Sequence, residues 1–198
     1  MSRSHSRKAE LRRDLLAVRA RLTVDDVRET GAVLARRALE LAELAEARTV
    51  AAYVSVGREP GTRALLDALR ARGTRVLLPV LLEDNDLDWG VYEGGERLAP
   101  ARRGLLEPEG GRLGPEAITT ADAVLLPGLA VDERGLRLGR GGGSYDRVLA
   151  RLERAGADPA LVVLLHDGEL LGAGEVPAEA HDRPVHAAVT PSGVRRFT

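Results

Sequence analysis

The chain has 198 residues, of which 44% are hydrophobic and 30% are charged, a composition typical of a globular protein rather than a disordered one. Its formal net charge of −1 gives no reason to expect binding to nucleic acid or to an anionic membrane. Cysteine is absent, which excludes disulfides, a thiolate nucleophile and a Cys-ligated zinc site.

The N-terminal segment MSRSHSRKAELRR is charged and leads into no apolar stretch, so we do not expect a signal peptide. No apolar run approaches the roughly 20 residues of a membrane-spanning helix. We therefore expect a cytoplasmic protein, a monomer or weak oligomer, whose partners are small molecules. Lys8 is the only lysine beside 28 arginines, which hints that a compact ammonium is needed there, for example to bind phosphate.

Residues of about 6–47 predict two helices. Apolar side chains recur at three- and four-residue spacing at Leu11, Leu15, Val18 and Leu22, forming one stripe. On the same helix Lys8 and Arg12 are four residues apart and should share a face. Thr23 suits the N-cap of a second helix, which we expect to run to about Ala47.

The sheet-bearing core is predicted over about 49–190. A strand at 49–56, a helix at 63–73 and a strand at 75–80 form a β-α-β unit. A strand at 87–92 and a long ordered loop at 94–115 follow, and then strands at 123–132, 160–165 and 185–190, with a helix at 144–156 before the second of these. We predict one α/β domain over 1–198, with a mostly parallel, Rossmann-like central sheet and helices on both faces.

Residues 134–147, RGLRLGRGGGSYDR, carry the most chemical information. Glycines before a helix leave backbone N–H groups free to converge on an anion, and the helix N-terminus adds a partial positive charge. Four arginines surround them, and Asp146 could hold a cation near phosphates. The segment is neither a P-loop nor the dinucleotide fingerprint. It therefore favours a nucleotide phosphate site, although a flexible glycine loop stays open as an alternative.

The stretch from Pro127 to Asp146, PGLAVDERGLRLGRGGGSYD, resembles without a gap a long motif of the 5-formyltetrahydrofolate cyclo-ligase (5,10-methenyltetrahydrofolate synthetase) family. The resemblance departs from the family at Ser144, where a tyrosine is usual, and at Val131, where phenylalanine is common. Further similar segments are found in the expected order over about residues 8–190. They are Lys8 and Arg12, Glu59 in a turn, Leu87 and Trp89, Glu107 and Pro108 in GLLEP, and Val176, Pro177, His181 and Asp182.

The resemblance implies an ATP-dependent reaction that needs Mg²⁺ and no protein nucleophile. ATP would phosphorylate the formyl oxygen of 5-formyltetrahydrofolate, N10 would attack the activated carbon, and 5,10-methenyltetrahydrofolate, ADP and phosphate would form. Catalysis would rest on positioning and on stabilisation of the transferred phosphoryl group.

The resemblance also implies roles for individual residues. Lys8, Arg140 and Asp146 would be catalytic, and Asp146 and Asp182 would bind the metal. The residues implied for ATP are Lys8, Arg12, Arg137, Leu138, Gly139, Arg140, Gly141, Gly142, Gly143, Ser144 and Tyr145. Those implied for the folate are Arg12, Val54, Glu59, Trp89, Arg140, Gly141, Gly142, Gly143 and Ser144.

Three alternatives remain open at this point. One is an enzyme of a related α/β fold that uses no ATP, such as a sugar-phosphate isomerase or acyl-CoA transferase relative, because fold does not fix function. Another is a homologue that acts on a different substrate. The third is a nucleic-acid-binding module built on the Arg-rich N-terminal helix, which the 3% aromatic content disfavours.

Overall fold

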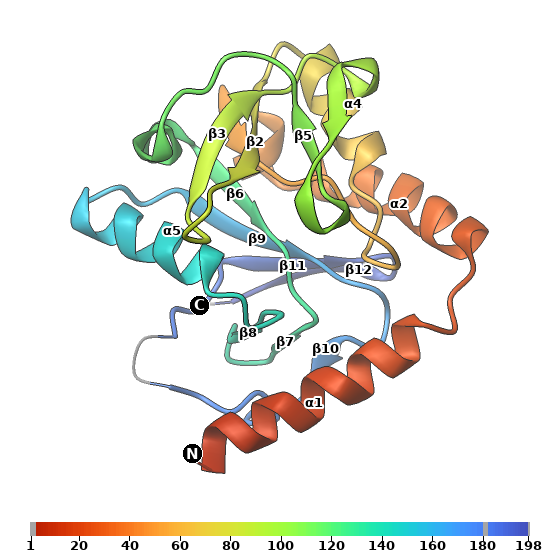
Figure 1. Cartoon of the computed structure of the whole chain (residues 1–198). Coiled ribbons are helices and arrows are strands. Elements are labelled where there is room, and N and C mark those ends of the chain that lie inside the picture. Colours follow the sequence, from red (N-terminus) through yellow and green to blue (C-terminus); the bar gives the residue numbers. More distant parts are fainter. Residues whose placement is uncertain (1–2, 180–181, 198) are drawn as a thin grey trace.

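The centre of the molecule is a seven-stranded sheet with the order β12-β11-β9-β6-β1-β2-β3 (Figure 1). The computed structural model describes residues 3–179 and 182–197. From β11 to β2 neighbouring strands are parallel, and β12 and β3 are antiparallel at the two edges. The strands are β1 (Thr49–Ala51), β2 (Arg75–Leu81), β3 (Leu87–Val91), β6 (Ala123–Leu126), β9 (Ala160–Leu164), β11 (Ala187–Thr190) and β12 (Gly193–Arg196).

Helices cover both faces of this sheet, so the predicted fold class is confirmed. On one face lie α2 (Val24–Ala38), α3 (Ala42–Ala45) and α4 (Arg63–Ala71); on the other lie α5 (Ser144–Arg154) and the 3-10 helix η3 (Pro115–Thr120). Successive β2 side chains alternate between the faces: Val76 and Leu78 pack in the first core, and Leu77 packs in the second. All three side chains are buried.

The predicted second helix is in fact two. Its start is as expected: Thr23 caps α2, and it exchanges hydrogen bonds with Asp26 in a capping box. α2 ends at Ala38, however, and Leu41 is extended, with φ −78° and ψ 119°. The break turns Leu41 and Leu44 into the core, where they are almost completely buried. Tertiary burial thus overrides the helical propensity of this segment.

Residues 94–115 are more regular than the predicted loop. They contain a hairpin of β4 (Leu98–Pro100) and β5 (Leu106–Pro108), together with the short 3-10 helices η1 (Gly95–Arg97) and η2 (Arg102–Gly104). The hairpin packs on β2 and β3, in the upper middle of Figure 1. Its strands are too short to give a recognisable alternation in sequence.

The predicted strand 123–132 is interrupted at Pro127 and Gly128. β6 ends before them, and β7 (Ala130–Asp132) belongs to a separate sheet of order β10-β7-β8. β8 (Arg137–Leu138) and β10 (Leu170–Leu171) complete this small sheet, and neither of them was predicted. Pro127 has no N–H to donate to a neighbouring strand, which favours the end of β6 at Leu126.

The first helix, α1 (Arg3–Arg19), lies along the small sheet rather than on the central one (Figure 1). Leu11 and Leu15 pack against the cluster of Leu129, Leu136 and Val176. Val18 is 57% exposed, so the predicted apolar stripe does not continue to the end of the helix. Among the described residues there is no helix with the length and apolar character to cross a membrane.

The backbones of α2 and of the segment before α4 meet at Gly31 and Gly61. A Cβ on Gly31 would lie 3.0 Å from the Gly61 carbonyl oxygen. We predict that Gly31→Ala lowers the free energy of unfolding by about 1–2 kcal/mol, because the steric cost exceeds the gain in helix propensity of about 1 kcal/mol. Urea unfolding of Gly31→Ala, Gly61→Ala and the double variant checks this.

Either substitution pushes the same two backbone segments apart. The double variant should therefore lose less free energy of unfolding than the sum of the two single losses. A Gly31→Ala protein more stable than the wild type would contradict the proposed contact.

Candidate active site at the carboxyl edge of the sheet

A cavity of about 380 Å³ opens where β1, β2 and β6 end. β1 is shorter than the predicted strand 49–56, because after Ala51 the chain leaves the sheet and lines the cavity with Tyr53, Val54 and Val56. β1 lies between β2 and β6, so the chain order reverses direction there. Such a switch point at the carboxyl ends of parallel strands is the usual ligand site of open α/β sheets.

The glycine loop of residues 139–143 forms one wall of the cavity. Gly141 and Gly143 have φ of 89° and 77°, left-handed values that favour glycine. Gly143 is also the N-cap of α5, and it offers no side-chain cap. The first N–H groups of α5 therefore remain available to an anion, as the sequence predicted.

Two arginines bind backbone carbonyls of residues that line the cavity. Arg12 of α1 donates from Nε to the Gly139 carbonyl at 2.8 Å, and Arg137 donates from Nη1 to the Pro127 carbonyl at 2.9 Å. Burial lowers the pKa of Arg137, although nearby Asp146 opposes this effect; Arg137 Nη2 lies 3.7 Å from Asp146 Oδ1. Arg12 and Arg137 thus both line the cavity and hold neighbouring backbone segments in position.

Lys8 is 5% exposed and lines the cavity beside Arg12, so the predicted common face is confirmed. Its Nζ lies 2.7 Å from Glu179 Oε2 and 2.9 Å from Asp182 Oδ2. Burial lowers the pKa of Lys8, but the hydrogen bonds to Glu179 and Asp182 outweigh it, so the pKa is raised. Lys8 therefore remains a charged ammonium in the cavity.

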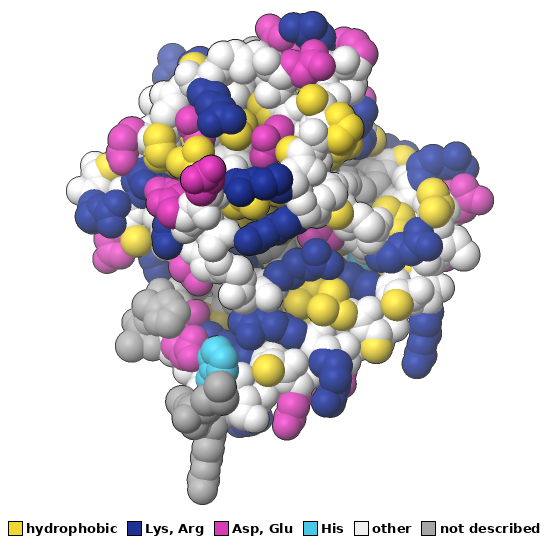
Figure 2. All heavy atoms as spheres, in the orientation of Figure 1, with side chains coloured by type: hydrophobic (Ala, Val, Ile, Leu, Met, Phe, Trp, Pro, Cys, Tyr) yellow, Lys and Arg dark blue, Asp and Glu magenta, His cyan; other side chains and the backbone are white. Residues whose placement is uncertain are grey.

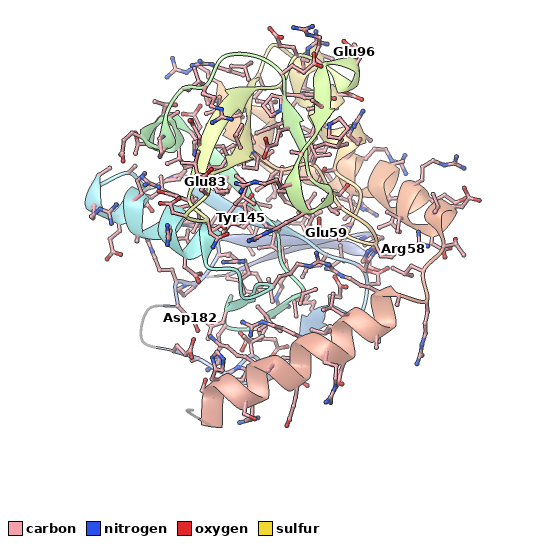
Figure 3. The ribbon with its side chains drawn as sticks, in the orientation of Figure 1. Arg58, Glu59, Glu83, Glu96, Tyr145 and Asp182 are labelled. Carbon is pink, nitrogen blue, oxygen red and sulfur yellow. The ribbon has the colours of Figure 1, made fainter. Side chains whose placement is uncertain are left out.

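Glu59 and Tyr145 face the middle of the cavity (Figure 3). Glu59 Oε2 accepts a hydrogen bond from the Val56 N–H, and its Oε1 lies 3.8 Å from Arg140 Nε. Burial raises the pKa of Tyr145, and its buried hydroxyl has no hydrogen-bond partner among the described residues. A buried polar atom of this kind is a free contact point for a bound ligand.

Asp146 and Asp182 both line the cavity, and Asp182 lies between α5 and the N-terminal half of α1 (Figure 3). Within the described part of the chain, no three His, Cys, Asp or Glu side chains gather as a metal cluster. One or two carboxylates together with ligand phosphates are the usual environment of Mg²⁺. The predicted pair therefore fits a magnesium ion that arrives with a phosphorylated ligand.

Asp132, the aspartate of the long motif that precedes the glycine loop, has a structural role. Its side chain is completely buried and accepts hydrogen bonds from the N–H groups of Arg134, Leu136 and Gly174. Arg134 also donates from its guanidinium to Asp132 Oδ2 at 2.7 Å. Asp132 thus closes the β7–β8 turn that delivers the loop to the cavity.

Arg19 anchors the other end of α1. It is 3% exposed and donates to both carboxylate oxygens of Glu169, at 2.6 and 2.9 Å. Nη2, which makes the longer of these two bonds, also donates to the Gly128 carbonyl oxygen at 2.7 Å, in the dipeptide at which β6 ends. Glu169 also accepts the N–H of His166. Arg19 therefore attaches the C-terminal end of α1 to Glu169 and to Gly128, which lines the cavity.

The structure places every predicted site residue except Trp89 at the cavity. Trp89 is completely buried in the core between the sheet and α5, so the prediction that it forms a ligand wall is wrong. Leu87, two residues closer to the cavity edge, lines it instead. His181 of the matched motif lies outside the described residues.

Several cavity residues were not predicted. Glu179 lies within the segment V-P-x-x-x-H-D, but at a variable position of the pattern, and Arg103 and Arg183 belong to no motif. Leu81, Leu105 and Leu106 give part of the cavity an apolar lining. Lys and Arg side chains gather across the middle of the molecule, between α1 and the β4–β5 hairpin (Figure 2). Only the structure brings these segments together.

The fold and the cavity thus define a class: an α/β protein with a cation-rich, glycine-walled ligand site at a topological switch point. The family model described as "5-formyltetrahydrofolate cyclo-ligase family" matches residues 4–191. The chain belongs to this family, which confirms the resemblance found in the sequence.

Named relatives agree with this assignment. The chain is 44% identical to a 5-formyltetrahydrofolate cyclo-ligase of Mycolicibacterium smegmatis, over 93% of each chain. It is 34% identical to the Escherichia coli K12 protein of the same name, over 89% of this chain and 96% of the other. Among solved structures, 5,10-methenyltetrahydrofolate synthetase of Aquifex aeolicus matches with a TM-score of 0.78 and 28% identity, over 96% of this chain and 92% of the other.

We predict that Arg19→Met lowers the free energy of unfolding by about 3–5 kcal/mol, because it leaves the buried Glu169 carboxylate without its partner. The matched control is Arg13→Met, since the Arg13–Asp14 pair is largely exposed and should contribute less than about 1 kcal/mol. Chemical unfolding of both variants measures the difference. Equal stabilities would refute a structural role for the Arg19–Glu169 pair.

We predict that Asp132 contributes stability that is lost in acid. Burial raises its pKa, but hydrogen bonds from Arg134, Leu136 and Gly174 lower it below the ordinary 3.8. Its contribution is therefore full above pH 3.8 and disappears as the pH falls through the lower folded-state pKa. Asp132→Asn should be less stable than the wild type at pH 7 and approach it below about pH 4.

Thermal melts from pH 7 to pH 3 measure this convergence. Asp14→Asn, at a largely exposed position, serves as the control and should follow the wild type throughout. A stability gap between Asp132→Asn and the wild type that stays constant with pH would contradict the assignment.

Proposed function

We propose that this protein converts 5-formyltetrahydrofolate to 5,10-methenyltetrahydrofolate with the hydrolysis of ATP to ADP and phosphate. The family assignment supports the reaction, and the cavity supports the use of a nucleotide. The observation that carries most weight is the convergence of Lys8 and Arg12 from α1 with the glycine loop and the uncapped N-terminus of α5 in one cavity. Together these groups fit a polyphosphate.

In this proposal the cationic half of the cavity holds the phosphates. Backbone N–H groups of the glycine loop and of α5 would bind phosphate oxygens, and Arg12 and Arg140 would neutralise their charge. The Lys8 ammonium has three N–H donors, so it can donate to a phosphate oxygen while it keeps a carboxylate partner. Donors fixed in advance in this way stabilise charge that develops during phosphoryl transfer.

The other half of the cavity would hold the folate. Glu59 can accept N–H bonds from the aminopyrimidinone ring, and Val54 with the neighbouring leucines offers an apolar surface to the ring system. Arg140, 3.8 Å from Glu59, borders both halves. Its guanidinium would therefore lie where the formyl oxygen meets the phosphoryl group.

Magnesium would be held between ligand phosphates and the carboxylates of Asp146 and Asp182. When bound, it neutralises phosphate charge and orients the transferred group. The contacts of Asp182 with Lys8 and of Asp146 with Arg137 keep these carboxylates directed at the cavity.

The proposed function predicts that absorbance of methenyltetrahydrofolate appears when protein, 5-formyltetrahydrofolate, ATP and Mg²⁺ are mixed. Omission of either ATP or Mg²⁺ should abolish the signal, because the formyl oxygen is a poor leaving group until it is phosphorylated. ATP-independent product formation would contradict the nucleotide role. Absence of product from a folded, ATP-binding protein would point to a homologue that acts on another substrate.

Lys8→Ala and Asp146→Ala should each lower turnover by about 100-fold or more while the fold is retained. The matched control is Arg7→Ala, because Arg7 is exposed, adjacent to Lys8 and absent from the cavity lining. ATP binding to each variant by calorimetry gives a readout that does not depend on turnover. Wild-type rates in both site variants would overturn the assignment of the phosphate site.

The family assignment removes the support for the isomerase, transferase and nucleic-acid alternatives. The cytoplasmic location and the monomeric or weakly oligomeric state stay predictions from the sequence, as does the extent of the domain over 1–198.

A further inference from the structure

Arg103 is the non-glycine cavity residue with a left-handed backbone. It lies in η2, at the tip of the β4–β5 hairpin, with φ 58° and ψ 26°. This conformation costs free energy for any residue with a Cβ, and such strain often marks a functional position. Gly104 follows with φ 71°, so the turn itself could form with glycine at both positions.

The left-handed turn sends two consecutive arginines to different places. Arg102 donates from Nη2 to the Leu81 carbonyl at 3.2 Å and lines a second, smaller hollow with Glu83, Glu107 and Arg112. Arg103 instead lines the main cavity, next to Leu105 and Leu106. The hairpin itself is held to β2 by Glu107, whose side chain accepts the Leu81 N–H at 2.9 Å. Arg103 is thus presented from a supported turn.

Three other cationic side chains of the cavity have acidic partners in the protein. Lys8 contacts Glu179 and Asp182, Arg137 lies near Asp146, and Arg140 lies near Glu59. Arg103, by contrast, forms no ion pair with any residue of the described ranges 3–179 and 182–197. Its guanidinium is therefore available to an anionic group of a ligand.

Arg103 comes from a different element than the cations of α1. The β4–β5 hairpin supplies Arg103 together with the apolar lining residues Leu105 and Leu106, whereas Lys8 and Arg12 reach the cavity from α1. A ligand that binds along this apolar part and ends in a carboxylate would match that arrangement. 5-Formyltetrahydrofolate has this form, since an aromatic benzoyl group joins its pterin to a glutamate with two carboxylates.

We propose that Arg103 binds a glutamate carboxylate of the folate and so determines specificity for the glutamate-bearing substrate. The inference rests on the proposed function. It adds a binding residue for the glutamate end of the substrate, which lies away from the reacting formyl group. Arg103 is thus a specificity residue that takes no part in phosphoryl transfer.

The test compares 5-formyltetrahydrofolate with 5-formyltetrahydropteroate, which lacks the glutamate. For Arg103→Gln we expect KM for the full substrate to rise about 10-fold, while kcat and KM for ATP stay at wild-type values. On the truncated substrate the variant and the wild type should have the same KM. Arg102→Gln, the neighbouring arginine that faces the second hollow, should match the wild type on both substrates.

Arg103→Gly separates binding from backbone geometry, since glycine adopts the left-handed conformation without strain. It should keep or raise Tm and still show the KM of Arg103→Gln. Arg103→Gly with wild-type KM, an equal KM increase on both substrates, or a raised KM for ATP would each overturn the proposal. A wild-type protein that forms no product from 5-formyltetrahydrofolate would refute the proposed function itself, and this inference with it.

Discussion

The site depends on how the polar helix α1 is held against the rest of the molecule. Its apolar contribution is small, because Leu11 and Leu15 are only partly buried. Three cations do the rest: Arg19 binds Glu169 and the Gly128 carbonyl, Arg12 binds the Gly139 carbonyl, and Lys8 binds two carboxylates. The partners other than Glu169, namely Gly128, Gly139, Glu179 and Asp182, line the cavity, so most of the contacts that attach the helix also assemble the site.

This arrangement explains the spacing of the long motif. Pro127 and Gly128 end β6 and expose carbonyls that arginines bind, Asp132 closes the following turn, and the glycines then carry the chain into α5. The carbonyls of Pro127 and Gly128 are thus placed to accept hydrogen bonds from arginines, and the N–H groups at the start of α5 are placed to bind an anion. A gap anywhere in this stretch would shift the glycine loop relative to α1.

Much of this could be predicted from the sequence, because strong local signals were present: buried strands, the Thr23 cap, and the glycine and arginine loop. Trp89 was misplaced because alternation along β3 shows that a residue is buried, but not whether a cavity or the core covers it. Arg103 and Glu179 could not be identified, since their roles arise from a hairpin tip and a distant turn meeting the cavity. The prediction that the second helix continues past Ala38 was wrong for a similar reason: burial of the Leu41 side chain stabilises the fold more than a helical backbone at this residue would.

The single lysine has a consequence for the chemistry of the protein surface. Acylating reagents and lysine-modifying enzymes require an accessible, neutral ε-amine. In this chain the only ε-amine, that of Lys8, is enclosed in the cavity and kept protonated by two carboxylates. The arginine-covered exterior therefore offers no side-chain amine for acetylation or cross-linking. Any covalent labelling of a lysine side chain in this protein would report directly on the state of the cavity.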